Sequence, residues 1–490
     1  MIYNSFKFIV LFPLIFLLYY VIPAKYQKAR NLFLLVVSYS LYISWKPVFA
    51  FVLLGVTAVT FWGGLIFDGR RKPFDGLRDR DDGREDSLSQ KKSLIWLFGV
   101  LGVLPLLVFK YYNFLNESIS EGLAAVGLQF GLPGLNWAVP IGISFFTFQA
   151  VGYMLDVYYG RIKAERNFLY YALFISFFPS ILSGPINKAS LVLPQIKNLR
   201  TYFDYGKAVE GLKMILWGMF MKVVVADRVG LYVDTILPSY MNYTGVTCFA
   251  ASIFYTIQIY ADFAGYSLMA IGIGKVLGFE LTENFRRPYF SVSVTEFWHR
   301  WHISLSTWLK DYVYIPLGGS RCSKARNYWN IFVTFLVSGI WHGANWTFIV
   351  WGCMHGVCQI IEKALGLNKK QSGNGWVKAV RILVTFLVVN FAWIFFRMPT
   401  LSEACGVIGC IFNFHQSLAL EITSKHIFLL MMIGTILLFI KDWTDEFFPD
   451  KVRLFNNRNR IIRWVSYLFI MILIMLTGVF DAGQFIYANF

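Results

Sequence analysis

Residues 327–362 read NYWNIFVTFLVSGIWHGANWTFIVWGCMHGVCQIIE, an almost continuous apolar run. The run is too long for one membrane-spanning helix of ~20 residues, so it predicts two helices or a bent pair. Residues 245–277 form a second run of this kind, and we expect the same arrangement there. The length and hydrophobicity of these runs indicate a helical membrane protein.

Further apolar runs recur along the rest of the chain. They cover residues 7–23, 31–45, 48–67, 93–109, 137–158, 168–186, 208–227, 379–397, 426–441 and 461–480. Together with the two long runs they predict an all-α polytopic membrane protein with about 11–13 transmembrane helices. We expect residues 1–490 to form a single multi-pass membrane domain.

The composition excludes a soluble globular protein. Hydrophobic residues make up 57% of the chain and charged residues only 15%, whereas soluble domains carry about 25% charged residues. The net charge is +17. In a membrane protein, an excess of Lys and Arg usually marks cytoplasmic loops, and it could also attract an anionic partner. The segment 68–92 holds many charges of both signs and predicts a cytoplasmic loop, with the N-terminus on the other side of the membrane.

The histidines are the best candidates for chemistry. The chain has 6, and four of them fall between residues 299 and 355. His342 lies inside an apolar run, where an ionisable group is costly and is by default a candidate functional residue. A buried imidazole stays neutral and could accept a proton from a hydroxyl group; the alternative is a structural histidine. Asn345 would share the helix face of His342 and orient it, or it could bond a neighbouring helix.

The segment 278–326 interrupts the apolar pattern and is rich in Trp, His, Arg and Tyr. This composition is typical of helices at the membrane interface or re-entering it. His299 and His302 are spaced like residues on one helix face, but two ligands do not make a metal site, so we expect no metal. His302 is instead a candidate second polar group beside His342, and Asp311 follows among aromatic residues.

Several motifs resemble those of the membrane-bound O-acyltransferases. They are PIGISFFTFQAVGYMLDVYYG (140–160), FPSILSGPI (178–186), ADFAGYSLMAIGIGKVLGF (261–279), NFRRPYFSVSVTEFWHRWHISLSTWLKDYVYIPLGG (284–319), VSGIWHGANWTFIVWGCMHG (337–356) and FAWIFFR (391–397). The chain looks most like the bacterial branch with an alginate O-acetylation membrane protein and, more distantly, a D-alanyl-lipoteichoic acid transfer protein. The resemblance covers most of residues 137–400, the expected catalytic core.

The resemblance implies a fold and a set of site residues. The fold would be a ring of membrane helices around a central tunnel, with His342 where a cytosolic and an extracytoplasmic funnel meet. His342 would be the general base or proton carrier, His302 would position or polarise the acyl donor, and Trp341 would support them. Asn345 and Asp311 are further supporting candidates. Donor-binding candidates are Arg286, Arg287, Arg300 and Lys310.

The implied activity is transfer of a short acyl group, most simply acetyl, in a bacterial plasma membrane. The donor would be a cytosolic acyl-CoA or acyl-carrier-protein thioester, and no cofactor would be bound permanently. The acceptor would be a hydroxyl of a cell-surface polysaccharide or of an extracytoplasmic acetyltransferase partner. The partners would thus include membrane lipid but no nucleic acid. Three alternatives stay open. The first is D-alanyl transfer to teichoic acid from a carrier protein, the second is a transporter or flippase with a proton-relay histidine, and the third is a scaffold for a secreted acetyltransferase.

Overall fold

The computed structural model describes residues 3, 5–68, 85–181, 184–198, 202–367, 374–413, 415–422, 424–449, 451 and 455–480, and all regular elements in these ranges are helices. Most of the predicted charged loop, residues 69–84, lies outside the described residues. The chain forms two compact units. The first contains Phe6–Ala208 and Gly274–Thr282, and the second contains Tyr3–Ser5, Val209–Ile273 and Glu283–Phe490.

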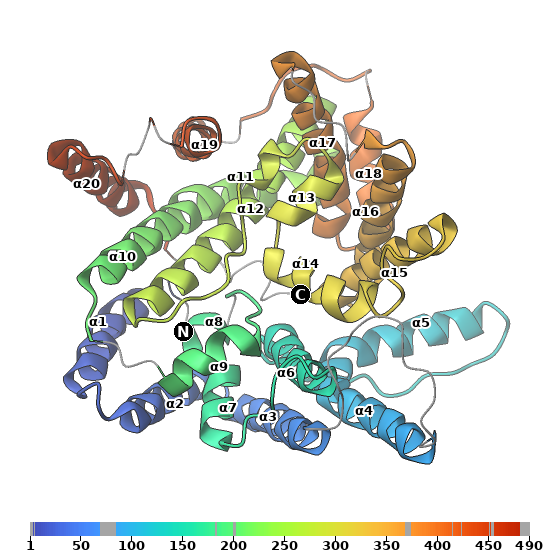
Figure 1. The fold of residues 1–490 in the computed structure, drawn as a ribbon. Coiled ribbons are helices and arrows are strands. Elements are labelled where there is room, and N and C mark those ends of the chain that lie inside the picture. Colours follow the sequence, from blue (N-terminus) through green and yellow to red (C-terminus); the bar gives the residue numbers. More distant parts are fainter. Residues whose placement is uncertain are drawn as a thin grey trace. The chain divides into compact units, whose positions relative to one another are not determined.

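The first unit is built from the N-terminal helices (Figure 1). They are α1 (Phe6–Val21), α2 (Gln27–Ile43), α3 (Pro47–Phe67), α4 (Glu85–Leu106), η1 (Leu107–Tyr111), α5 (Tyr112–Ala124), α6 (Ile143–Tyr158), α7 (Phe168–Ser176), α8 (Phe178–Ile181) and α9 (Ala189–Asn198). The apolar run 168–186 was expected to be long enough to span, but it does not form one helix, because α7 ends before Phe177. Pro179 follows at the start of α8, and a proline restricts the preceding backbone and removes an amide donor.

The second unit holds most of α10 and α12 and all later helices (Figure 1). They are α10 (Tyr205–Met219), η2 (Phe220–Ala226), α11 (Asp227–Ile236), η3 (Leu237–Asn242), α12 (Gly245–Val276), η4 (Pro288–Phe290), α13 (Val294–Arg300), α14 (Ile303–Leu309), η5 (Lys310–Tyr314), α15 (Lys324–His342), α16 (Trp346–Ala364), α17 (Gly375–Arg397), α18 (Leu401–Ile411), α19 (Lys425–Phe447) and α20 (Arg460–Thr477).

The two longest apolar runs fold differently. Residues 327–362 form α15 and α16, which confirms the prediction of two helices. Residues 245–277 were expected to divide as well, but they form the single 32-residue helix α12. Helix α12 can exceed the thickness of a bilayer because 78% of its most apolar window is buried inside the protein rather than exposed to lipid. Length alone therefore does not break a helix whose surface is covered by its neighbours.

Six helical segments of the described chain are long and apolar enough to cross a membrane. They are Pro47–Phe67, Ser93–Ala124, Gly245–Val276, Gly375–Arg397, Lys425–Phe447 and Arg460–Thr477. These segments confirm the prediction of an all-α membrane protein with several spans. The larger count of about 11–13 helices stays a prediction from the apolar runs.

The segment 278–326 contains short helices. Both α13 and α14 have 7 residues, and a tight corner at Trp301 and His302 separates them. Neither helix can span a bilayer, since a spanning helix needs ~20 residues. This agrees with the expected interruption of the apolar pattern, whereas the depth of these helices in the membrane stays a prediction.

Candidate active site

His342 is the last residue of α15, and the chain turns immediately after it. Gly343 follows in an extended conformation, and Asn345 then caps α16. The two helices lie side by side (Figure 1). A side chain at Gly339 would approach the Phe348 carbonyl oxygen to 2.4 Å, and one at Gly352 would approach the Phe335 carbonyl oxygen to 2.5 Å. Only glycine allows this packing, which carries His342 into the interior.

Aromatic rings surround His342. Its ring centroid lies 4.8 Å from that of Trp341, 4.9 Å from Trp351 and 5.3 Å from Phe396. These residues come from α15, α16 and α17, and His342 itself is 2% exposed. An imidazole in so apolar a setting is shielded from bulk water, which strengthens its interactions with any polar group that enters.

His302 lies at the corner between α13 and α14. Its φ of 44° is in the left-handed region, which costs a non-glycine residue ~1–3 kcal/mol and persists only where the surroundings impose it. The corner is held by backbone hydrogen bonds from Arg286 to the Arg300 carbonyl and from Ile303 to the Asn284 carbonyl, both 2.9 Å long. His302 is fully buried, and desolvation lowers the pKa of its ring from 6.5 to about 3. His302 is therefore neutral at pH 7.

The fold brings the two predicted histidines together across 40 positions of sequence. The ring centroids of His302 and His342 are 6.5 Å apart, and Trp341 lies 5.9 Å from His302. This separation is too long for a direct hydrogen bond between the rings. Two buried imidazoles therefore lie next to each other. A side chain of this kind can take the proton of a hydroxyl group.

The expected role of Asn345 is corrected by the structure. Because α15 ends at His342, Asn345 does not share its helix face. The Asn345 side chain accepts the backbone N–H of Thr347 at 3.0 Å and donates to the Pro399 carbonyl at 2.6 Å. Asn345 thus fixes the start of α16. The sequence argument failed because it assumed an unbroken helix through Gly343.

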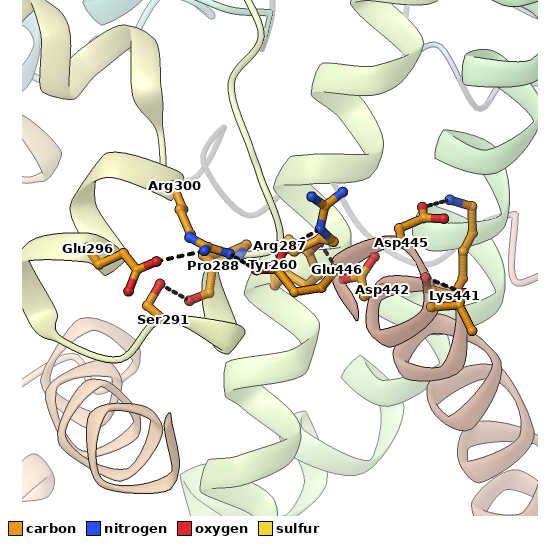
Figure 2. Close-up of polar contacts among 11 residues, drawn as sticks. Tyr260, Arg287, Pro288, Ser291, Glu296, Arg300, Lys441, Asp442, Asp445 and Glu446 are labelled. Atoms are coloured by element: carbon orange, nitrogen blue, oxygen red, sulfur yellow. Dashed lines mark hydrogen bonds and ion pairs between the residues drawn. The ribbon is translucent and has the colours of Figure 1, made fainter. Parts of the chain in front are cut away.

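The predicted donor-binding arginines are engaged with carboxylates. Figure 2 shows Arg287 and Arg300 on either side of Glu446 of α19, at 2.8 and 2.9 Å. Arg300 also pairs with Glu296 at 2.6 Å, and Arg286 pairs with Glu283. Their charges are therefore largely balanced within the protein, which weakens the prediction that they attract an anionic donor.

The two remaining predicted residues lie together on η5. Lys310 is exposed, and Asp311 is partly buried beside it. His299 is exposed near the end of α13, whereas His302 is buried beyond it, so the two do not share a helix face. Among the described residues, no group of three or more His, Cys, Asp or Glu side chains is placed to hold a metal ion.

Sequence reasoning gave no role to His355 on α16. His355 is 1% exposed, and its Nδ1 accepts the indole N–H of Trp298 at 3.3 Å. Trp351 contacts both His342 of α15 and His355 of α16, with ring-centroid distances of 4.9 and 5.0 Å. The signal was present in the sequence, because His355 also lies in an apolar run.

A buried ion cluster was also missed. Lys222 of η2 lies 2.7 Å from Asp227 and 2.6 Å from Asp262 of α12, and all three side chains are buried. Lys222 could have been found as a charge inside the apolar run 208–227, but nothing in the sequence showed its partners.

The helices and the site define a multi-pass membrane protein with a pair of buried histidines in its second compact unit. A family model described as "MBOAT, membrane-bound O-acyltransferase family" matches residues 159–401, which include both histidines. The chain belongs to the membrane-bound O-acyltransferase family, and it is an O-acyltransferase.

Three relatives illustrate the similarity. The chain is 40% identical over 418 residues to the "Probable alginate O-acetylase AlgI" of Pseudomonas syringae pv. tomato, covering 84% of this chain and 76% of the relative. It is 37% identical to the "Peptidoglycan O-acetyltransferase" of Helicobacter pylori, covering 56% of this chain and 57% of the relative. It is 26% identical to the "Teichoic acid D-alanyltransferase" of Bacillus subtilis, covering 80% and 97%.

Proposed function

We propose that this O-acyltransferase moves an acetyl group from a cytosolic thioester to a hydroxyl on a cell-surface polysaccharide or on a secreted acetyltransferase. The observation that carries the proposal is the buried pair His302 and His342, 6.5 Å apart in the matched region. Two relatives, an alginate O-acetylase and a peptidoglycan O-acetyltransferase, support acetyl as the group and polysaccharide as the acceptor class.

In the proposed reaction, His342 takes the proton of the acceptor hydroxyl as its oxygen attacks the thioester carbonyl carbon. A C–O bond forms, the C–S bond breaks, and the thiolate leaves and receives the proton from His342. General-base catalysis of this kind contributes roughly 10²–10⁴ in rate. The aromatic cage formed by Trp341, Trp351 and Phe396 excludes water, which protects the thioester from hydrolysis.

The donor is proposed to be an acyl-CoA or an acyl-carrier protein, with no permanently bound cofactor. Because Arg286, Arg287 and Arg300 are paired with carboxylates, exposed Lys310 is the better of the predicted cations for an anionic donor. The proposed location is the plasma membrane of a bacterium, where cytosolic donor and extracytoplasmic acceptor are on opposite sides.

The test uses the full chain purified and reconstituted in proteoliposomes. Labelled acetyl-CoA or an acetylated carrier protein is supplied on one side and a polysaccharide on the other, and transfer of label is measured. We expect His342→Ala to lower transfer by at least ~10²-fold. The matched control is His299→Ala, because His299 lies near the site in sequence but is exposed; it should retain activity.

Other outcomes separate the alternatives. Label transfer from a D-alanyl carrier but not from an acetyl donor would favour the teichoic acid reaction. This reaction is the second candidate because the 26% identical relative is a teichoic acid D-alanyltransferase. Absence of His342-dependent transfer from any donor, with persisting lipid or sugar flux, would refute the proposal in favour of a transporter. Unchanged polysaccharide acetylation in cells carrying His342→Ala would instead indicate a scaffold for another acetyltransferase.

A further inference from the structure

Asn284 lies at the centre of a buried polar cluster that has no role in the reaction proposed above. Its side-chain oxygen Oδ1 accepts the backbone N–H of Ser304 at 3.2 Å and the Ser304 hydroxyl at 2.9 Å. Its Nδ2 donates to the Ser267 hydroxyl of α12 at 3.0 Å. Asn284, Ser304 and Ser267 are all buried, so water does not compete for these bonds.

These contacts fix which way the Asn284 amide points. A backbone N–H can only donate a hydrogen bond, so the atom of Asn284 that faces Ser304 must be the oxygen. In the opposite orientation, the amide NH₂ would face that N–H donor, and a buried donor would be left unsatisfied, which folded proteins avoid. The orientation therefore follows from the neighbours and not from an arbitrary choice between oxygen and nitrogen.

The amide orientation in turn fixes the proton on His302. Nδ1 of His302 lies 3.1 Å from Asn284 Oδ1. This oxygen carries no hydrogen, so the hydrogen of that bond must be on Nδ1. A neutral imidazole carries one N–H, and the other nitrogen is then an acceptor.

An aromatic ring also packs against the His302 ring. Phe263 of α12 meets His302 edge-on with ring centroids 4.7 Å apart. The left-handed backbone of His302 and the hydrogen bond from Ile303 to the Asn284 carbonyl fix the corner that carries it. The same residue, Asn284, thus fixes both the backbone and the ring of His302.

We propose that Asn284 is a positioning residue of the site, which holds neutral His302 as the Nδ1–H tautomer so that His302 acts in the reaction as a hydrogen-bond acceptor through Nε2. The inference rests on the proposed acyl transfer and deepens it. A histidine with an acceptor nitrogen cannot polarise the thioester carbonyl, which needs a hydrogen-bond donor. His302 instead belongs with His342 to the proton-accepting side of the site.

His355 provides an internal contrast. Its Nδ1 accepts a hydrogen bond from Trp298, and an indole N–H can only donate. Neutral His355 must therefore carry its proton on Nε2, the opposite tautomer from His302. One spectrum of the protein should show both forms.

The decisive experiment is ¹⁵N NMR of the full chain in nanodiscs, labelled selectively on histidine. Signals are assigned by their loss in His302→Gln and His355→Gln. We expect His302 to show a protonated Nδ1 and an unprotonated Nε2, and His355 to show an unprotonated Nδ1 and a protonated Nε2. A protonated Nε2 on His302 would overturn the proposal. This measurement needs no turnover, so its result can support or overturn the tautomer assignment independently of the acyl-transfer assay.

Variants of Asn284 connect the tautomer to the reaction. Asn284→Leu should give a mixture of His302 tautomers and lower kcat by about 10–100-fold, since a wrong tautomer costs up to ~10⁴ where a histidine is central to catalysis. Asn284→Asp keeps an acceptor at Nδ1 and should preserve the tautomer. Its carboxylate would stabilise the imidazolium and move the acid limb of the pH–rate profile upward.

Ser267→Ala is the matched control. It removes the partner of Nδ2 and leaves the contacts of Oδ1, so the tautomer of His302 and the pH–rate profile should not change. If Asn284→Leu fails to fold, Asn284→Asp still tests the proposal through the pH–rate profile. An unchanged profile in Asn284→Asp, or an unchanged tautomer in folded Asn284→Leu, would refute the positioning role.

Discussion

Glu446 provides a sensitive test of how the corner carrying His302 is supported. Its carboxylate bridges Arg287 of the loop before η4 and Arg300 at the end of α13, with N···O distances of 2.8 and 2.9 Å (Figure 2). The Glu446 side chain is 12% exposed, and the two arginine side chains are 31% and 19% exposed. Glu446→Gln removes the charge but keeps the size of the side chain.

The expected loss follows from burial. Removing one partner of a fully buried ion pair costs about 3–5 kcal/mol, because the other charge is left without compensation. Here water can partly solvate Arg287, so we expect Glu446→Gln to lower the free energy of unfolding by ~2–3 kcal/mol. Asp445 is the matched control one residue earlier. Within the described part of the chain, its ion pair is with Lys441 one turn away on the same helix, and such a pair contributes about 0.3–0.5 kcal/mol.

The assay is the free energy of unfolding in mixed micelles, from titration with SDS, together with acyl transfer. Glu446→Gln should also lower activity, because Arg300 adjoins the corner of His302. In an Arg300→Met background, the cost of Glu446→Gln should shrink by ~0.5–3 kcal/mol, the range of coupling between residues in one network. Equal stabilities of Glu446→Gln and Asp445→Asn would refute the reasoning that the bridge supports this corner.

Two further predictions concern buried charge. Lys222→Met should destabilise the protein by about 3–5 kcal/mol in the same titration, because Asp227 and Asp262 lose their buried partner. Adding Asp262→Asn should recover part of this loss, and no recovery would contradict the ion-cluster interpretation. Burial lowers the pKa of His302 from 6.5 to about 3, so between these pH values the unfolded chain binds more protons than the folded protein. The free energy of unfolding present above pH 6.5 is therefore lost as the pH falls toward 3, by up to ~1.4 kcal/mol per pH unit. His302→Asn should flatten this dependence, and an equally steep dependence in that variant would refute the assignment.

The sequence by itself determined the class of protein and nominated His342 as its candidate catalytic residue. Apolar runs of ~20 residues can satisfy their backbone in lipid only as helices, so composition alone indicated a helical membrane protein. His342 stood out because a titratable group in an apolar run is costly. The motif around it then indicated the acyltransferase family, which the match over residues 159–401 confirms.

The tertiary structure decided what surrounds that residue. Asn345 was misplaced because the sequence does not show that α15 ends at His342. Asn284, Lys222 and Glu446 could not be recognised as parts of clusters, because each meets its partners through contacts distant in sequence. A hydrogen-bond partner is a property of three-dimensional proximity, and local pattern carries little information about it. The sequence could therefore nominate His302 and His342. The distance between them, and which ring nitrogen of His302 carries the proton, depend on the packed fold.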